Sequence, residues 1–525
     1  MLGGPWKGII TSAHPRQIPK DFFSYSENIR YRFGRAMLIG ALSDPEDLPS
    51  GVGSVLHIEN VPRRNGTTVT MLLGTEKVYA GSISSFLDVT PTGWGTGTPT
   101  MVSAVHVVTG GAEYYCFVND VDDGFFYYDM DTGTSTKVDL TSADVSIKGG
   151  KYLGLFKDQI IIANIRGTST ILDAPNGYVY GSTLGPLDFN GASSGDNQII
   201  DTEGPINAVF RIQDYFAFAK PWSITIAQYT GIPEDPHRLF TIDGVGVGAP
   251  KSVARIPSAQ VVVFLGMDAQ LYVFNGQAVK PIGDPVFNLL YKWAKMNDSK
   301  TQITNVVSAV IPAYGEYWLV FEDKGIIVWN YVDNTWQIYI MRDDDGKTQN
   351  IIGFGEGFTV SSAVYWDDVT QDWDSVLLDW DDFGGAVSSA VPIVVVGTQA
   401  FRLGAQVTNN ATIRTYQMRL PKPTQISRVV LDIYAPSGGT VKCRYSNDGG
   451  TKWSTWTSIV LEAEPLQNPD RRAFWNFIAT GDRWQFEFDF SGQPYMELLD
   501  IGIDFVVHKG QEVVTPASEE HNVAN

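Results

Sequence analysis

Apolar and polar positions along this chain form short runs that end in turn residues. Between Glu203 and Gly283, three runs of β-branched and aromatic residues are each closed by Gly, Pro, Asn or Asp. Such runs are typical of strands that are joined by tight turns. Similar pairs of strands recur from about Val61 to Leu403, for example within 113–129 and 316–339. The pattern therefore predicts an all-β fold.

The spacing of these elements divides the chain into four parts. Irregularly spaced hairpins predict a β-propeller-like platform with insertions over residues 61–410, because a propeller lays down many strands without long exposed edges. Alternation that is clearest in W-Q-F-E-F-D-F predicts a β-sandwich over 411–510. The proline-dotted residues 1–60 are predicted to be an extended N-terminal arm, and the polar residues 511–525 a mobile tail. One short helix is expected at 286–294, after Pro285.

Composition and charge narrow the possible functions. The chain has 525 residues, of which 43% are hydrophobic, so it can fill a sizeable core. A formal net charge of −20 argues against tight, sequence-reading contact with nucleic acid, although acidic walls would let DNA pass without sticking, and simple solubility explains the charge equally well. Cys116 and Cys443 form no disulfide framework, which favours synthesis in a reducing cytoplasm. No continuous apolar run predicts a membrane-spanning segment.

Two features concentrate acidic side chains in one region. A Trp-Asp repeat places Trp366, Trp373 and Trp380 seven residues apart, which fits either a helical stripe or a series of β-turns. The D-D-D-G run at 343–346 supplies only part of a calcium loop, so we interpret these acids as a solvated loop cluster or as the lining of a channel. The candidate residues for this cluster are Asp343, Asp344, Asp345, Asp367, Asp368, Asp374, Asp381 and Asp382.

Motifs that carry catalysis are not found in the sequence. The run S-N-D-G-G-T-K-W at 446–453 resembles the Asp-box of sialidase-type propellers, in which the Asp and Gly shape a hairpin turn, and it predicts such a turn. The six histidines lack zinc-binding spacing, and neither GxSxG nor Walker A occurs. The run G-V-G-V-G at 244–248 is interpreted as a flexible joint between strands. We expect no catalytic residue, metal or cofactor.

Four segments together suggest a family. They are E-N-I-R-Y-R-F-G-R-A at 27–36, F-R-I-Q-D-Y-F-A-F-A-K-P-W-S-I-T-I at 210–226, G-V-G-V-G-A-P-K-S-V-A at 244–254 and F-L-G-M-D-A-Q-L-Y-V-F-N-G at 264–276. In this order, followed by a β domain, the chain resembles the tail nozzle or packaged-DNA stabilisation proteins of short-tailed bacteriophages.

The resemblance implies a structural protein of the virion tail that is made in the host cytoplasm and has no enzymatic activity. It implies a hexameric ring that contacts the portal adaptor and the tail fibres or spikes, retains the packaged double-stranded DNA, and lets it pass on infection. The clustered Arg30, Arg32 and Arg35 are the candidates for docking the arm onto an adaptor or a neighbouring subunit. The alternative is a carbohydrate-binding propeller, either a receptor-binding or a lectin-like protein, and a further one is a glycoside hydrolase.

Overall fold

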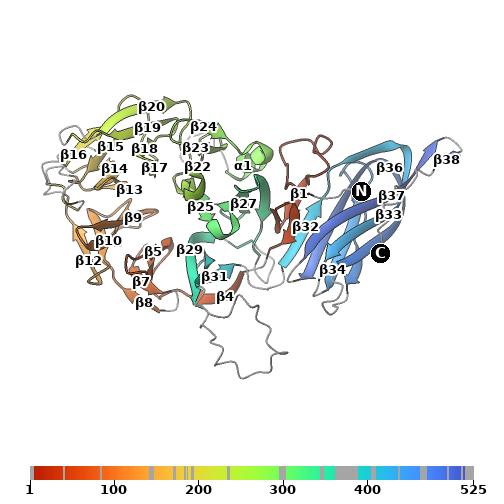
Figure 1. The fold of residues 1–525 in the computed structure, drawn as a ribbon, viewed down its shortest axis with the longest axis horizontal. Helices are drawn as coiled ribbons and strands as arrows, with labels where there is room; N and C mark the ends of the chain where they lie inside the picture. The colour runs from red at the N-terminus through yellow and green to blue at the C-terminus, as the bar shows by residue number, and fades with distance from the viewer. Residues whose placement is uncertain are drawn as a thin grey trace, which may run out of the picture. The chain divides into compact units, whose positions relative to one another are not determined.

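Strands make up most of the part of the chain that the structure describes, as Figure 1 shows. The computed structural model describes residues 5–39, 42–82, 85–140, 147–168, 173–182, 185, 187–190, 194–232, 237–294, 303–304, 306–342, 348–349, 351–360, 388–403, 409–435, 438–461, 470–493, 496–509 and 512–514. Seven four-stranded antiparallel sheets are the blades of a β-propeller, which confirms the predicted fold class. Contacts group the chain into two compact units, Leu42–Gln198 with Ile351–Gly404, and the remainder.

The unit that contains Leu42–Gln198 holds four blades. Three are built from consecutive strands: β5 (Val55–Pro62), β6 (Thr68–Gly74), β7 (Val78–Ser82), β8 (Ser85–Asp88); β9 (Val102–Thr109), β10 (Ala112–Asn119), β11 (Phe125–Asp129), β12 (Thr134–Val138); β13 (Gly149–Phe156), β14 (Gln159–Arg166), β15 (Ala174–Tyr180), β16 (Gly195–Gln198). The fourth combines distant segments, namely β29 (Ile351–Val360), β30 (Ser388–Val396), β31 (Gln399–Leu403) and β4 (Leu42–Asp47). Residues 42–47 and 55–60, which the sequence analysis assigned to the arm, therefore lie in strands of two blades.

The other unit holds three blades and the C-terminal domain. Its blades are β17 (Ala208–Ile212), β18 (Tyr215–Ala219), β19 (Ser223–Tyr229), β20 (His237–Asp243); β21 (Ala254–Ile256), β22 (Val261–Leu265), β23 (Leu271–Phe274), β24 (Val279–Pro281); β25 (Val306–Ile311), β26 (Glu316–Phe321), β27 (Gly325–Asn330), β28 (Thr335–Tyr339). The expected helix is α1 (Phe287–Trp293), which buries Leu290 and Trp293. Short 3-10 helices lie at η1 (Pro250–Ser252), η2 (Pro257–Ala259), η3 (Asp284–Val286) and η4 (Pro312–Tyr314).

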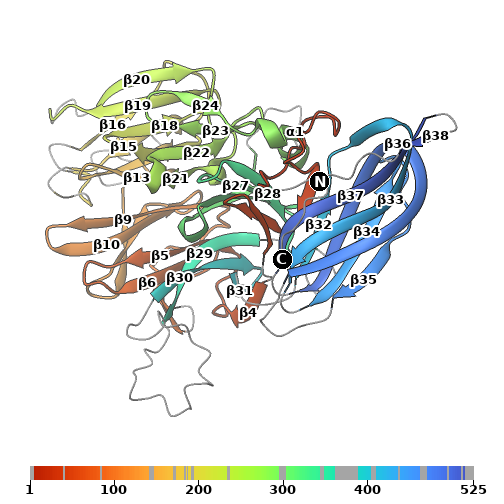
Figure 2. The same cartoon turned by 45° about the vertical axis from the view of Figure 1, so that its right-hand side comes forward.

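The C-terminal domain is a β-sandwich whose longest strand serves both sheets. Its strands are β32 (Asn409–Arg414), β33 (Met418–Tyr434), β34 (Gly439–Ser446), β35 (Thr457–Leu461), β36 (Asp470–Gln493), β37 (Glu497–Lys509) and β38 (Glu512–Val514). Up to Trp484, β36 pairs with β33, and from Gln485 onward it pairs with β34. The long strands β33, β36 and β37 lie together in Figure 2. Alternate residues of β36, including Trp484 and Phe486, fill the core.

Part of the predicted N-terminal arm, residues 25–38, forms strands that pair with the sandwich. Strand β1 (Tyr25–Glu27) pairs with β32, and the hairpin of β2 (Ile29–Arg32) and β3 (Arg35–Leu38) pairs with β37. Trp6 and Phe23 join one hydrophobic core that includes side chains of the β25–β28 blade and of the sandwich. The arm therefore closes the space between this blade and the sandwich.

The glycine run at 244–248 is packed from Gly246 to Gly248, so the prediction of a flexible joint does not hold for these three residues. A Cβ on Gly246 would lie 2.0 Å from the Lys220 carbonyl oxygen, and a Cβ on Gly248 would lie 2.6 Å from Gly266. Val247 between them is buried. Gly246 and Gly248 are needed because the backbone at Lys220 and at Gly266 approaches them closely, which leaves no room for a side chain.

Candidate functional site

The arm is anchored to the β25–β28 blade by one buried carboxylate. Glu316, at the start of β26, is fully buried. It accepts hydrogen bonds from Arg30 Nε at 2.8 Å, Trp318 Nε1 at 2.8 Å, Gln337 Nε2 at 2.9 Å and the Tyr339 hydroxyl at 3.1 Å. A buried carboxylate is tolerated when donors and an opposite charge compensate it, as these four groups do. The arrangement holds the arm and leaves no acceptor on Glu316 for a substrate.

The three arginines that were predicted to dock a partner have different environments. Arg30 forms an ion pair with Glu316, and its guanidinium stacks on the Tyr314 ring at 3.8 Å from the ring centroid. The Arg32 guanidinium lies 5.1 Å from the ring centroid of Phe33. Arg35 forms a 3.5 Å ion pair with Glu497, and its side chain is 64% exposed. Docking by this group stays a prediction, and Arg35 presents the most accessible charge.

The Asp-box-like run forms the predicted turn between β34 and β35. Asp448 Oδ1 accepts hydrogen bonds from the backbone N–H groups of Thr451 and Lys452, each at 3.0 Å, and from the Ser446 hydroxyl at 2.8 Å. The Ser446 hydroxyl oxygen in turn accepts from the Gly450 N–H. The hydrogen bond from the Lys452 N–H lowers the pKa of Asp448, and the Ser446 hydroxyl adds to the effect. The turn is a rigid support for the residues that follow it.

Those residues lie beside a row of charged and aromatic side chains that crosses four strands. Tyr25 of β1 pairs with Arg414 of β32, Arg414 pairs with Glu487 of β36, and Glu487 pairs with Arg444 of β34. Directly paired residues lie on the same face of a sheet. Glu487 is buried and binds both guanidinium groups, at 3.3 Å from Arg414 Nη2 and 2.7 Å from Arg444 Nη2.

Two tryptophans extend the row into a stacked ladder. The Arg414 guanidinium lies 5.7 Å from the Tyr25 ring centroid and 5.2 Å from that of Trp453. The Arg444 guanidinium lies 5.1 Å from Trp453 and 4.4 Å from Trp456. Stacking of guanidinium on aromatic rings is favourable, and it fixes the orientation of each ring. The ladder ends at Trp456, which is 38% exposed.

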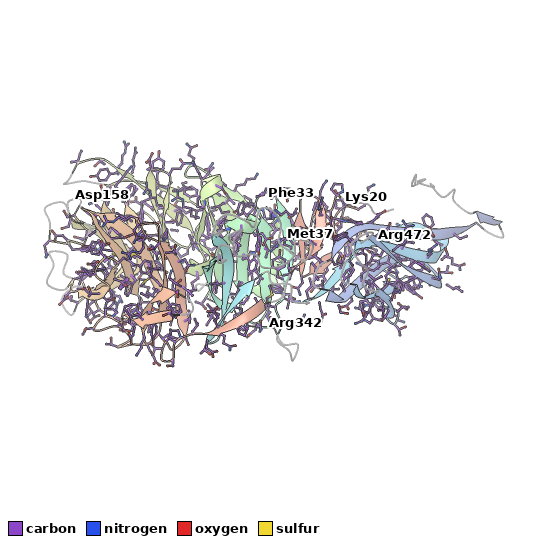
Figure 3. All side chains as sticks on the ribbon, turned by 60° about the horizontal axis from the view of Figure 1, so that its bottom comes forward. Lys20, Phe33, Met37, Asp158, Arg342 and Arg472 are labelled. Carbon is purple, nitrogen blue, oxygen red and sulfur yellow. The ribbon has the colours of Figure 1, made fainter. Side chains whose placement is uncertain are left out.

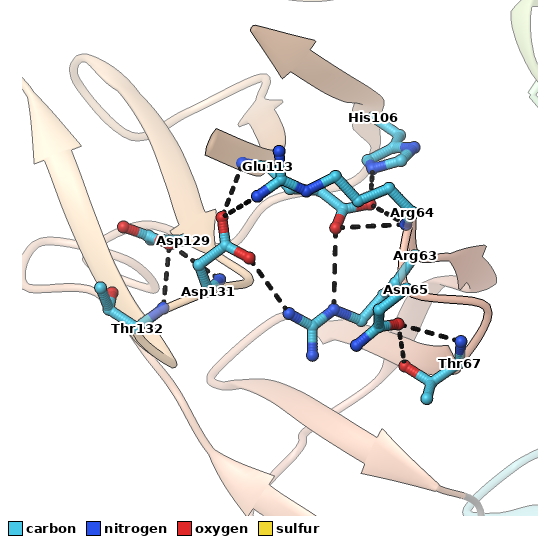
Figure 4. Close-up of polar contacts among 9 residues, drawn as sticks. All are labelled: Arg63, Arg64, Asn65, Thr67, His106, Glu113, Asp129, Asp131 and Thr132. Carbon is cyan, nitrogen blue, oxygen red and sulfur yellow. Dashed lines mark hydrogen bonds and ion pairs between the residues drawn. The ribbon is translucent and has the colours of Figure 1, made fainter. Parts of the chain in front are cut away.

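A second charged network lies in the other unit and joins β9, β10 and the turn after β5 (Figure 4). Glu113 is buried and accepts from His106 Nε2 at 2.8 Å and from the Arg64 N–H at 3.1 Å. Arg63 Nε lies 3.7 Å from Glu113, and Arg63 and Arg64 both pair with Asp131. Each acid is therefore compensated by neighbouring donors, as in a structural network.

A shallow pocket of about 500 Å³ lies where the arm meets the β21–β24 blade and α1. Its polar groups bond mainly to one another. Asp268 accepts from the Tyr272 hydroxyl at 2.6 Å, and Asp284 accepts from Gln270 Nε2 at 2.6 Å. Burial raises the pKa of Tyr272, and its hydrogen bond to Asp268 raises it further. Asn288 of α1 donates to the Ser12 carbonyl oxygen, which closes one side.

Within the described ranges, no three His, Cys, Asp or Glu side chains gather closely enough to hold a metal ion. Both cysteines are buried free thiols, and burial raises the pKa of each. No helix in the described part of the chain is long and apolar enough to cross a membrane. The Trp-Asp repeat and the acidic candidates Asp343, Asp344, Asp345, Asp367, Asp368, Asp374, Asp381 and Asp382 lie outside the described residues.

No protein-family model and no curated protein matches this chain. Among solved structures, YCF48 bound to D1 peptide is 9% identical over 69% of this chain and 98% of its own, with a TM-score of 0.38. The extracellular domain of the putative hybrid two component system BT3049 from B. thetaiotaomicron is 9% identical over 69% of this chain and 42% of its own, with a TM-score of 0.41. TmCBM61 in complex with beta-1,4-galactotriose is 13% identical over 20% of this chain and 70% of its own, with a TM-score of 0.16. At these identities the likeness concerns the fold alone.

Proposed function

We propose that this chain is a structural subunit of the tail nozzle of a short-tailed bacteriophage, assembled as a hexameric ring that retains the packaged DNA and opens on infection. The proposal begins with the resemblance carried by residues 27–36, 210–226, 244–254 and 264–276. In this role the protein contacts the portal adaptor and the tail fibres or spikes, and DNA passes without sequence-specific binding.

The observation that carries the proposal is the continuous core that joins arm, blade and sandwich. Trp6 of the arm, Trp336 of β28 and Trp475 of β36 belong to the same buried cluster. A shared, close-packed core transmits force because it has little freedom to deform. A nozzle subunit withstands the pressure of packaged DNA, so a rigid link between the β25–β28 blade and the sandwich suits the task.

The pattern of charge supports the same role. The net charge is −20, and among the residues that the structure describes the buried carboxylates Glu113, Glu316 and Glu487 are each paired with a basic side chain. Pairing of this kind compensates the cost of burying each charge inside the subunit. The remaining excess of acid repels a polyanion at short range, which keeps a DNA conduit free of tight contacts.

The test is quantitative mass spectrometry of purified phage particles, with this chain counted against the portal protein. We expect half as many copies as portal subunits, as a hexamer below a dodecameric portal requires. The major capsid protein, whose ratio to the portal is fixed by the shell, serves as the internal control. Absence from particles, or copies far above one ring, would remove the nozzle function.

A further inference from the structure

The exposed end of the aromatic ladder on the sandwich has the properties of a ligand platform. One face of the Trp456 indole is covered by the Arg444 guanidinium, and the side chain remains 38% exposed. Arg444 is itself held by Glu487 through two hydrogen bonds of 2.9 Å and 2.7 Å. The ring is therefore fixed before any ligand arrives, so a ligand that stacks on it does not have to restrict its motion.

Polar groups extend from this ring along the same face of the sheet. Ser458 of β35 pairs with Lys442, which in turn pairs with Asp489. Lys442 lies two residues before Arg444 in β34 and so on the same face of the sheet as the guanidinium that contacts Trp456. Lys442 Nζ and Asp489 Oδ1 form a 3.4 Å ion pair at this position. Residues two apart in extended chain are separated by about 7 Å. The Ser458 hydroxyl thus lies two residues along the chain from the Trp456 ring, and an ammonium donor (Lys442) and a carboxylate acceptor (Asp489) follow on the two neighbouring strands.

We propose that this surface, formed by Trp456, Ser458, Lys442 and Asp489, binds a neutral saccharide. Stacking on an indole suits the apolar C–H face of a pyranose, while paired donors and acceptors suit its hydroxyl groups. The site lies on the sandwich and not on the propeller, where the sequence analysis had placed a possible carbohydrate-binding function. It does not depend on the nozzle proposal, because it concerns a different surface property of the same chain.

Two other ligand classes fit less well. Both ladder arginines are already bound by Glu487, so they offer little to the phosphates of a single-stranded nucleic acid, which relies on such cations. A quaternary ammonium prefers an aromatic cage, whereas Arg444 already supplies the cation for Trp456. A neutral, hydroxyl-rich ligand needs neither a free guanidinium nor a second cation site.

The experiment is saturation-transfer NMR with the full chain and a panel of neutral disaccharides and trisaccharides, followed by titration of the strongest binder. We expect dissociation constants of about 1 mM, as a shallow surface site gives, and a loss of at least about tenfold in Trp456→Ala. Trp456→Phe, which keeps a smaller ring, should retain part of the binding and guards against an effect of misfolding. Trp222→Ala removes another exposed tryptophan, which lies on a blade, and should bind as the parent does.

Three results would overturn the proposal. They are no binding by any member of the panel at about ten times the expected dissociation constant, equal binding by the parent and Trp456→Ala, and an equal loss in Trp222→Ala. Oligothymidylate that binds more tightly than every saccharide, with the same dependence on Trp456, would assign the platform to nucleic acid instead. The copy number in particles is unaffected by Trp456→Ala if the site serves ligand binding alone, so this test and the nozzle test can fail separately.

Discussion

Asp122 shows how a single side chain shapes a loop in the blade unit. It lies between β10 and β11, is 2% exposed, and accepts hydrogen bonds from the N–H groups of Gly95 at 2.8 Å, Thr96 at 3.0 Å and Gly97 at 3.1 Å. Asn119 Nδ2 donates a further bond at 2.7 Å. Burial raises the pKa of Asp122, but the hydrogen bond from the Thr96 hydroxyl, together with those from Asn119 and the backbone N–H groups, outweighs burial and holds the pKa below its usual value.

Replacing Asp122→Asn should therefore destabilise the protein. The amide nitrogen would face N–H donors, and at least one would be left unsatisfied, so we expect a loss of about 2 to 4 kcal/mol in the free energy of unfolding at pH 7. Because the folded pKa is depressed, the stabilisation by Asp122 is complete above about pH 5 and is lost as the pH falls below about 4. The difference between the two proteins should shrink over that range in urea unfolding.

The control is Asp158→Asn, which changes an exposed carboxylate in the turn between β13 and β14. It should alter the free energy of unfolding by less than about 0.5 kcal/mol, both at pH 7 and below about pH 4. An Asp122→Asn protein as stable as the parent, or a difference that grows as the pH falls, would show that the carboxylate does not hold this loop.

At the scale of the element, the β2–β3 hairpin has an unusual turn. Arg32 pairs with Arg35, so Phe33 and Gly34 form a two-residue loop, with φ of 51° and 76°. Two positive φ values are the mark of a type I′ turn, in which Asn or Gly is preferred. Phe33 is 69% exposed on the surface (Figure 3), and its N–H donates to Asp333 Oδ2 whatever side chain it carries.

Phe33→Asn should stabilise the hairpin, because Asn tolerates the left-handed conformation better by roughly 1 kcal/mol. The ring also contacts the Arg32 guanidinium, and losing that exposed contact costs about 0.5 kcal/mol. Phe33→Ala loses the ring without the conformational gain and is the matched control. In thermal unfolding the Asn variant should melt above the Ala variant, and the reverse order would mean that the turn is not under strain.

The elements differ in how far the sequence predicts them. Hairpins such as β10–β11 are visible because aromatic runs end at a glycine turn, and α1 is visible because Pro285 precedes apolar residues at helical spacing. Strand β4, with the letters L-S-D-P-E-D, has no strand pattern of its own. It is a strand because it pairs with β31, more than three hundred residues later, and local pattern carries no information about that pairing.

The candidate sites are harder to predict for the same reason. The clustered arginines at 30–35 were noticed, but Glu316, which binds Arg30, lies 286 residues away. The ladder depends on the register of four strands from three distant segments, and only its Asp-box turn has a local signature. A search for Trp next to the turn, combined with Arg in the preceding strand, is the signal that could have pointed to Trp456.

At the scale of the whole molecule, the arm links parts that would otherwise be independent domains. The Trp6 N–H donates to the Gly34 carbonyl oxygen at 2.8 Å, and its Nε1 donates to the Leu498 carbonyl oxygen of β37 at 3.2 Å. Three residues later, the Ile9 N–H donates to the Trp336 carbonyl oxygen of β28. Trp6 is 2% exposed and therefore lies in the core that the blade and the sandwich share.

Trp6→Ala should consequently weaken both partners of the arm at once. Removing a buried tryptophan costs about 3 to 5 kcal/mol, since the cavity cannot be refilled without moving two packed elements. In native-state hydrogen exchange, we expect amides of β28 and of β37 to lose protection together, while Trp222→Ala, at an exposed position, changes neither. Loss confined to β37 would mean that the arm belongs to the sandwich alone. The blade would then be free to move against it, and the rigid link on which the proposed structural role depends would not exist.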